Sequence, residues 1–344
     1  MEKFSQFRDR GSGISPFMPI TASPSSFAIA MSAFRFLLRL PFFLTYSALY
    51  FLVLHHLPLP AVARKLLLWT LLAIPGIWWV DLQLDGVKRG SLSQQPPSRV
   101  PHPRSIIAAN FTSPIDALYL AAVFDPIFVV AHPGSRKVRR ISLFSAISAA
   151  LSGSTQFADP PPPDGNNGNN KNDDGGITDL GALLARHPDR VIAVFPECAT
   201  TNGQGILPLS PCLLTAPAET AIFPVSMRYN PPDITTPIPG ARAWVDFLWK
   251  LLGGTTHTIR VRIAEGVHNT TQASNGVSSS YNSHETLTSG GGGGRRGEDE
   301  PTAEEQRMLD RVAEALARLG RVKRVGVTVR TKKDFVAAWN KRRR

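Results

Sequence analysis

The stretch of sequence that decides the fold is NFTSPID, residues 110–116, read together with FPECATTNG, residues 195–203. Each block lies at the end of a short apolar run, SIIAA at 105–109 and RVIAVF at 190–195, that predicts a buried strand. The first block leads into an apolar segment, 115–123, that predicts a helix. The second block is a strand end followed by a hydroxyl-rich turn, which offers backbone N–H and threonine groups to a phosphate.

Further strands and helices alternate along the chain on both sides of these blocks. The patterns predict strands at 126–131, 220–227, 258–263 and 324–329, and helices at 137–151, 179–186, 302–319 and 333–339. Such alternation predicts an α/β fold, in which a mixed and mostly parallel sheet is flanked by helices.

Composition divides the chain into five parts. Residues 1–30 lack a hydrophobic period and are expected to be disordered, 31–90 carry long apolar runs, and 91–265 form the α/β domain. Within that domain, 160–176 is a low-complexity insertion rich in Pro, Asn and Gly. Residues 266–300, rich in Ser, Asn and Gly, predict a disordered linker because they cannot bury enough apolar surface. Residues 301–344 contain a C-terminal helix, a strand and a basic tail.

The apolar runs predict a membrane-associated protein. Residues 40–63 contain no Asp, Glu, Lys or Arg, and this length suffices to cross a hydrocarbon layer of about 30 Å. A second run, 66–80, is interrupted by Pro75-Gly76 and ends in Trp78-Trp79, which suits a membrane interface. Three arrangements remain open: a span followed by an interfacial or re-entrant helix, a helical hairpin that enters one leaflet, and helices buried in a soluble protein.

The net charge of +12 is concentrated at the C-terminus, where residues 318–344 hold eleven Lys/Arg against one acid, Asp334. A basic tail fits an anionic membrane surface or a nucleic acid, and it is equally typical of a solvated helix face. No zinc-finger, helix-turn-helix or RNA-binding pattern accompanies it, so we expect a lipid partner and no nucleic acid. The two cysteines, Cys198 and Cys212, suggest neither a disulfide framework nor a metal site, and they favour a reducing compartment.

The two blocks resemble the signature sequences of the glycerolipid (lysophosphatidic acid) acyltransferases, which read NHxSxxD and FPEGT. The likeness covers roughly residues 75–265 and implies a fold like that of glycerol-3-phosphate acyltransferase. The segment GVKRGS at 86–91 and the tail KKDFVAAW at 332–339 resemble the fungal members in particular. That narrower resemblance implies a location in the endoplasmic reticulum membrane or on lipid droplets.

The resemblance also implies the residues of the site. Catalytic roles fall to Asp116, Ser113 and Asn110, which match the first signature. Substrate-binding roles fall to residues of the second signature and of two neighbouring segments: Glu197, Thr200, Thr201, Asn202, Gly203, Arg136, Lys137 and Pro224. No metal is implied, and no cofactor other than acyl-CoA as the co-substrate. Read from the residues alone, Ser113 and Asp116 are also the pattern of a helix cap.

Three positions depart from the family pattern. Phe111 stands where the family has its histidine base, Cys198 stands where it has glycine, and FADP at 157–160 lacks the arginine of the family's FxDR. The basic residues at 136, 137, 139 and 140 are candidates to replace that arginine, although a solvated helix face explains most of them. His102 and His132 are candidate replacements for the base, and each is also explained as an ordinary loop histidine.

Two functions follow as hypotheses. The first is a membrane-bound acyltransferase that moves an acyl group from acyl-CoA to a lysophospholipid such as lysophosphatidic acid. The alternative is a non-catalytic homologue that binds lipid or acyl-CoA, because a phenyl ring cannot accept the proton of the substrate hydroxyl. A membrane tether that acts through the basic tail is a third reading, which leaves both blocks unexplained.

Overall fold

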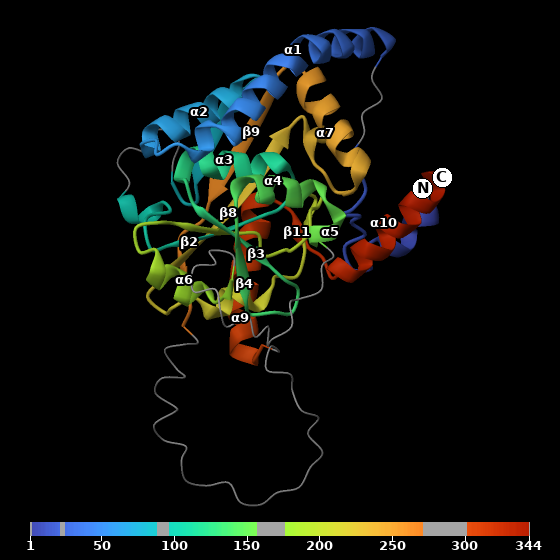
Figure 1. The fold of residues 1–344 in the computed structure, drawn as a ribbon. Helices are drawn as coiled ribbons and strands as arrows, with labels where there is room; N and C mark the ends of the chain where they lie inside the picture. Colours follow the sequence, from blue (N-terminus) through green and yellow to red (C-terminus); the bar gives the residue numbers. More distant parts are fainter. Residues whose placement is uncertain (1, 21–24, 88–95, 157–175, 271–300, 344) are drawn as a thin grey trace, which may run out of the picture.

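The computed structural model describes residues 2–20, 25–87, 96–156, 176–270 and 301–343 (Figure 1). Within these residues, nine strands form one sheet: β1 (Ile77–Leu84), β2 (Ile106–Ala109), β3 (Ile127–Ala131), β4 (Val138–Ile141), β5 (Ile177–Thr178), β6 (Ile192–Val194), β8 (Ala221–Asn230), β9 (His257–Ile263) and β10 (Val267–His268). A small second sheet pairs β7 (Gly205–Ile206) with β11 (Lys323–Arg324). The α/β prediction is therefore confirmed.

The centre of the main sheet is parallel and its flanks are mixed. The strand order is β1-β9-β8-β2-β6-β3-β4-β5, and β10 pairs with β8. Strands β8, β2, β6 and β3 run parallel to one another, whereas β4 is antiparallel to β3 and β9 is antiparallel to β8. Neighbouring parallel strands end at the same edge of a sheet. The segments after β2 and β6, which are the two signature blocks, are therefore brought together there.

Helices cover both faces of this sheet. The helices are α1 (Ser26–Leu52), α2 (Ala61–Ala73), α3 (Pro114–Phe124), α4 (Leu143–Leu151), α5 (Gly153–Gln156), α6 (Leu180–Arg186), α7 (Ala241–Gly253), α9 (Ala303–Gly320) and α10 (Val329–Arg343). Side chains alternate along a strand, so Ile107 and Ala109 of β2 pack in one core with α2, α3, α4 and α7. Ile106 and Ala108 face the opposite core, which is formed with α6 and α9.

The apolar N-terminal half is partly helical and partly strand. Helix α1 is long and apolar enough to cross a membrane, and only 6% of its most apolar window is buried. A buried helix of a soluble core is therefore excluded for α1. The second apolar run was expected to form an interfacial, re-entrant or hairpin helix interrupted at Pro75-Gly76. Helix α2 stops at Ala73, as the interruption predicts, but Trp78 and Trp79 lie in β1, which pairs in parallel with β9, so a helix is the wrong prediction for that end.

Three other expected segments differ from the structure. The strand predicted at 324–329 is reduced to the two residues of β11, and helix α10 already begins at Val329. The segment 137–151 is a strand, β4, followed by helix α4, because residues 138–141 pair with β3. The N-terminus was expected to be disordered, yet Phe4, Phe7 and Phe17 are buried in a cluster with Phe335 of α10. These aromatic side chains lack a period and find their partners at the other end of the chain, so that the two termini lie close together in Figure 1. The insertion and linker predictions fall largely on 157–175 and 271–300, outside the described residues.

Candidate active site

The two signature blocks contact each other directly at the carboxyl edge of β2 and β6. The backbone N–H of Phe111 donates to Oε1 of Glu197 at 3.2 Å, and the N–H of Thr201 donates to the carbonyl of Phe111 at 2.9 Å. The other carboxylate oxygen of Glu197 accepts from the N–H of Leu207 at 3.0 Å. Glu197 therefore fixes the first block, the second block and the loop that follows in one arrangement.

Glu197 lies in a fully buried position, which is unusual for a carboxyl group. Burial raises its pKa to about 8, while the two backbone hydrogen bonds and Lys332 act in the opposite direction. A carboxyl whose pKa lies near neutral pH is a feature of functional sites, although structural networks produce it too.

Asp116 and Ser113 form the N-terminal cap of α3. The Oγ of Ser113 accepts from the N–H of Ile115 at 3.4 Å, and the carboxylate of Asp116 accepts from the N–H groups of Thr112 and Ser113 at 2.7 and 2.8 Å. The hydroxyl of Tyr229 donates a short hydrogen bond to the same carboxylate. Burial raises the pKa of Asp116 to about 6, and these hydrogen bonds oppose that shift. The capping role is thus confirmed, and a catalytic role for this pair remains a proposal.

Asn110 ties the first block to β8. Its side-chain amide donates to the carbonyl of Met227 at 2.9 Å and accepts from the N–H of Met227 at 2.7 Å. Pro224 lies buried on the same strand, in register with Ala108 of β2. Both residues therefore set the position of the strand end that carries Phe111.

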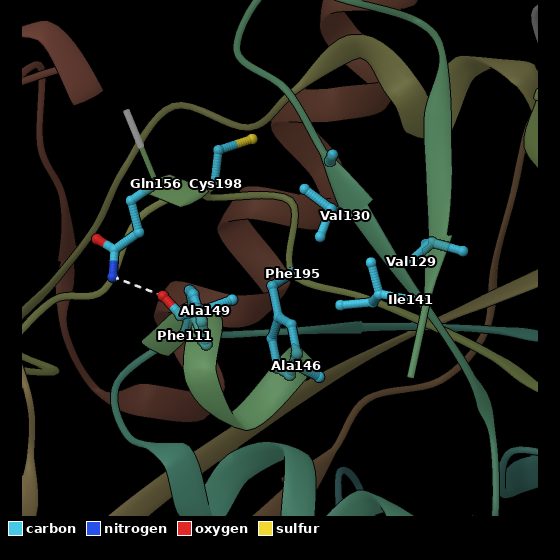
Figure 2. A pocket seen from close by; sticks show the side chains of 10 residues that line it. Phe111, Val129, Val130, Ile141, Ala146, Ala149, Gln156, Phe195 and Cys198 are labelled. Atoms are coloured by element: carbon cyan, nitrogen blue, oxygen red, sulfur yellow. Dashed lines mark hydrogen bonds between the residues drawn. The ribbon is translucent and has the colours of Figure 1, made fainter. Parts of the chain in front are cut away.

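Phe111 occupies the position of the family's histidine and is 5% exposed. Its ring stacks on Phe195 with the centroids 4.5 Å apart and an angle of 22° between the planes. Figure 2 shows these rings at a small pocket that is otherwise lined by aliphatic side chains, Gln156 and Cys198. The pocket volume is about 30 Å³, which holds little more than a water molecule. An acyl chain or a head group enters here only if the walls move.

The turn of the second block is held by the N-terminal segment and by a hydrogen bond within the turn. The side-chain amide of Asn202 donates to the carbonyls of Ser15 and Met18 at 2.9 Å each, and Thr201 Oγ1 accepts from the N–H of Gly203 at 3.3 Å. Gly203 has φ 74° and Cys198 has φ 57°. The left-handed conformation that suits the family's glycine is thus kept by Cys198, at a cost in strain for a residue with a Cβ. Burial raises the pKa of the Cys198 thiol well above its ordinary value, which disfavours a reactive thiolate.

The basic residues predicted to replace the missing arginine do not gather at the pocket. Arg136 forms a two-pronged ion pair with Glu305 of α9, at 2.8 and 2.9 Å, and Lys137 is exposed. Among the candidate bases, the His102 ring lies 3.1 Å from the carbonyl of Val100, before β2 begins, and His132 follows the end of β3. Neither histidine lines the pocket that contains Phe111.

Two curated fungal proteins are similar to this chain. "Putative lysophosphatidic acid:oleoyl-CoA acyltransferase" of Schizosaccharomyces pombe is 29% identical over 271 residues, which cover 77% of this chain and 84% of that protein. "Lysophosphatidic acid:oleoyl-CoA acyltransferase 1" of Saccharomyces cerevisiae is 23% identical over 215 residues, 61% of each chain. The resemblance to the fungal lysophosphatidic acid acyltransferases is confirmed. No protein-family model matches the chain. No solved structure matches it either.

Three residues that sequence reasoning missed complete the site of this acyltransferase-like chain. Tyr229 on β8 binds Asp116, Gln156 at the end of α5 lines the pocket, and Lys332 of α10 is completely buried beside the second block. The Nζ of Lys332 donates to the carbonyl and to Oγ1 of Thr200, at 2.7 and 2.8 Å, and makes a short hydrogen bond to Gln156. The only sequence signal for Lys332 was its place in the family-like tail KKDFVAAW, where a surface role was the expectation.

Proposed function

We propose that this chain is a membrane-bound acyltransferase, which transfers an acyl group from acyl-CoA to the hydroxyl of a lysophospholipid such as lysophosphatidic acid. The observation that carries the proposal is that the two blocks contact each other at one edge of the sheet, beside an apolar pocket. Asp116 of the first block and Glu197 of the second are 81 residues apart in the sequence. The names of the two fungal relatives support the same reaction.

In this reaction the lysophospholipid hydroxyl attacks the thioester carbonyl, the ester bond forms, and the thiol of CoA leaves and takes up a proton. Phe111 cannot accept the hydroxyl proton. A missing base costs roughly 10²- to 10⁴-fold in rate, whereas positioning and charge stabilisation remain. The proposed contribution of the chain is therefore to bind both substrates. Asp116 and Glu197 hold the two blocks in place, and the turn formed by Thr200, Thr201, Asn202 and Gly203 is the proposed substrate-binding segment of the second block.

The position of α1 supports membrane attachment within one leaflet. Helix α1 contacts the domain between Arg35 and Tyr50: the Arg35 and Arg39 side chains donate to carbonyls at 252–255 and Pro75, Tyr46 donates to Leu67 at 3.0 Å, and Tyr50 is buried. Its outer side exposes Phe27, Phe34, Leu37, Leu38, Phe42 and Leu52. A helix held against a domain at several points along one side fits an in-plane orientation with its apolar side in the lipid, rather than a crossing of the bilayer.

Helix α7, which packs against α1 (Figure 1), extends this surface with Trp244, Val245 and Trp249. Tryptophan is enriched at the membrane–water boundary. This surface, together with the fungal resemblance, supports the proposed location on the endoplasmic reticulum membrane or on lipid droplets.

One observation favours the alternative, a homologue that binds lipid or acyl-CoA without catalysis. The stack of Phe111 on Phe195 fills the position where a base would act, and the pocket beside it is small. This alternative predicts binding of acyl-CoA without any product.

The test uses the purified chain in phospholipid vesicles with labelled oleoyl-CoA and lysophosphatidic acid as probes. The wild-type chain is compared with Asp116→Ala, Glu197→Ala and the control Glu314→Ala, a carboxylate on the exposed side of α9. We expect ester product from the wild type and the control, and a loss of at least tenfold in both site variants. Labelled acyl-CoA that binds to all four proteins without product supports the alternative instead.

A further inference from the structure

We propose that the C-terminal helix α10 is part of the acyl-transfer site, and that Lys332 is a positioning residue that holds Thr200 and Gln156 in place. This inference rests on the proposed function for its meaning in catalysis. It does not follow from the signature blocks, because α10 begins at Val329, more than 120 residues after the second block ends at Gly203.

The amino group of Lys332 is buried and surrounded by hydrogen-bond acceptors. The side chain has 0% exposure, although lysine is almost never fully buried unless it is paired. An ammonium group has three N–H donors, and three acceptors surround it: Gln156 Oε1, the Thr200 carbonyl and Thr200 Oγ1. All three donors are used, which fits a charged donor that fixes its partners rather than a neutral amine that accepts a proton.

The partners of Lys332, Gln156 and Thr200, are themselves bonded to other parts of the site. Gln156 lines the pocket that contains Phe111 and also donates to the carbonyl of Ala149 on α4 at 3.0 Å, as Figure 2 shows. Thr200 donates from its hydroxyl to the carbonyl of Thr236 at 2.7 Å. One buried lysine side chain therefore links the turn of the second block to the pocket wall.

Lys332 lies close enough to Glu197 for each group to affect the pKa of the other. Glu197 and Lys332 are both fully buried, and each shifts the pKa of the other toward its charged form, although burial is the larger effect and acts against both charges. Lys332 thus places a basic side chain beside Gln156, which directly precedes the segment 157–160 that lacks the family's arginine.

Helix α10 is held in place by the packing of Phe335 against the N-terminal segment. Phe335 is fully buried three residues after Lys332, and its ring contacts Phe4 and Phe7 edge-on at 5.5 and 5.4 Å and Phe17 at 6.0 Å. The same apolar cluster includes Ala199 and Leu207 on either side of the second-block turn. Both chain ends therefore pack against the turn, and the Lys332 side chain extends from α10 to Thr200 within it.

The experiment compares Lys332→Met and Lys332→Ala in the full chain with Lys333→Met, the adjacent and exposed lysine of the same helix. Folding is checked by circular dichroism. We expect the Lys332 variants to lower kcat for acyl transfer tenfold or more, the effect of losing a hydrogen bond to a charged group, with KM for acyl-CoA unchanged. The control keeps the wild-type rate. A folded Lys332→Met protein with wild-type kcat overturns the proposal.

Chemical rescue separates positioning from proton transfer and from folding. Added propylamine replaces the atoms that Lys332→Ala removes, and rescue proportional to the ammonium form is the expected result. Rescue proportional to the free amine identifies Lys332 as a base and contradicts a positioning role. Loss of the folded state in both Lys332→Ala and Lys332→Met overturns the proposal in favour of a role in folding alone.

A measurement without catalysis distinguishes failure of this inference from failure of the proposed function. Amide hydrogen exchange over residues 196–207 is expected to rise in Lys332→Met and to stay unchanged in Lys333→Met. If the wild-type chain forms no ester, the proposed reaction is wrong, yet this exchange result still decides whether Lys332 positions the second block. Unchanged exchange in Lys332→Met rejects that role.

Discussion

At the scale of single residues, Phe111 and Glu197 define what the site can do. The phenyl ring stacked on Phe195 removes the base, while the buried carboxyl still joins the two blocks through backbone N–H groups. The hydrogen bonds that join the two blocks are therefore present, whereas the residue that would accept the proton of the substrate hydroxyl is missing.

The first prediction concerns Phe111→His. An imidazole at this strand end restores a proton acceptor in the first block, so we expect acyl transfer to rise by tenfold or more, within the roughly 10²- to 10⁴-fold range of general base catalysis. Phe111→Leu is the matched control, because it removes the ring stack without adding a base. Equal rates in the two variants show that any gain comes from loosening the pocket.

The second prediction concerns the pH dependence of stability. The pKa of Glu197 is raised from 4.5 to about 8 in the folded chain. The folded state thus holds a proton that the unfolded state releases, and the contribution of Glu197 to the free energy of unfolding falls as pH rises from about 4.5 to 8. Denaturant unfolding in detergent between pH 5 and pH 8 measures this slope. We expect the free energy of unfolding to decline less steeply with pH in Glu197→Gln than in the wild type. Identical slopes in the two proteins contradict a raised pKa of Glu197.

At the scale of secondary structure elements, the sequence predicts the centre of the sheet well and its margins less well. Strands β2, β3 and β6 are short apolar runs bounded by polar residues, so their local pattern suffices. Trp78 and Trp79 read as the end of a membrane-interface helix, and only the distant partner β9 makes them a strand. Likewise β4 is polar at Arg139 and Arg140, and pairing with β3 rather than periodicity determines its conformation.

The candidate site was predictable only where it resembles a known signature. The two matched signatures predict that their residues lie close together, and the structure places four of them at one edge of the sheet: Asn110, Ser113, Asp116 and Glu197. Lys332 and Gln156 were not predictable, because a buried lysine has no local pattern and its burial depends on how the chain ends pack. Arg136 was misleading for the same reason, since its partner Glu305 lies 169 residues away.

The third prediction concerns α1. The double variant Phe34→Asp/Leu37→Asp places charges on the side of the helix that is exposed to lipid in our account, and we expect it to lose most of its flotation with vesicles of phosphatidylcholine and phosphatidylserine. Ala303→Asp/Gln306→Asp, on exposed positions of α9, is the control with the same added charge and is expected to float like the wild type. Flotation of the α1 variant at the wild-type level contradicts the in-plane membrane surface.

At the scale of the whole molecule, the two chain ends close over the second block. The N-terminal segment binds Asn202 through the carbonyls of Ser15 and Met18, and α10 binds Thr200 through Lys332. Both ends meet in the aromatic cluster around Phe335. The basic C-terminal tail is thus in part a structural element of the core, and exposed residues near its end, such as Lys341, are available for an anionic membrane.

The fourth prediction concerns this closure. Phe335→Ala removes a fully buried ring, which costs roughly 3–5 kcal/mol in the free energy of unfolding. Because the ring joins both termini, we expect amide exchange to rise together in residues 2–18, 196–207 and 329–340. Lys333→Ala, on the exposed side of the same helix, is the control. A rise confined to α10 shows that the chain ends are not coupled.

The central claim is that this chain catalyses acyl transfer although Phe111 replaces the base. The most direct measurement is the number of phosphatidic acid molecules formed per purified chain from oleoyl-CoA and lysophosphatidic acid in vesicles, quantified by mass spectrometry together with released CoA. The account predicts more than one product per wild-type chain, equal amounts of free CoA, and loss of both in Glu197→Ala. Bound acyl-CoA with no phosphatidic acid above that of Glu197→Ala contradicts it.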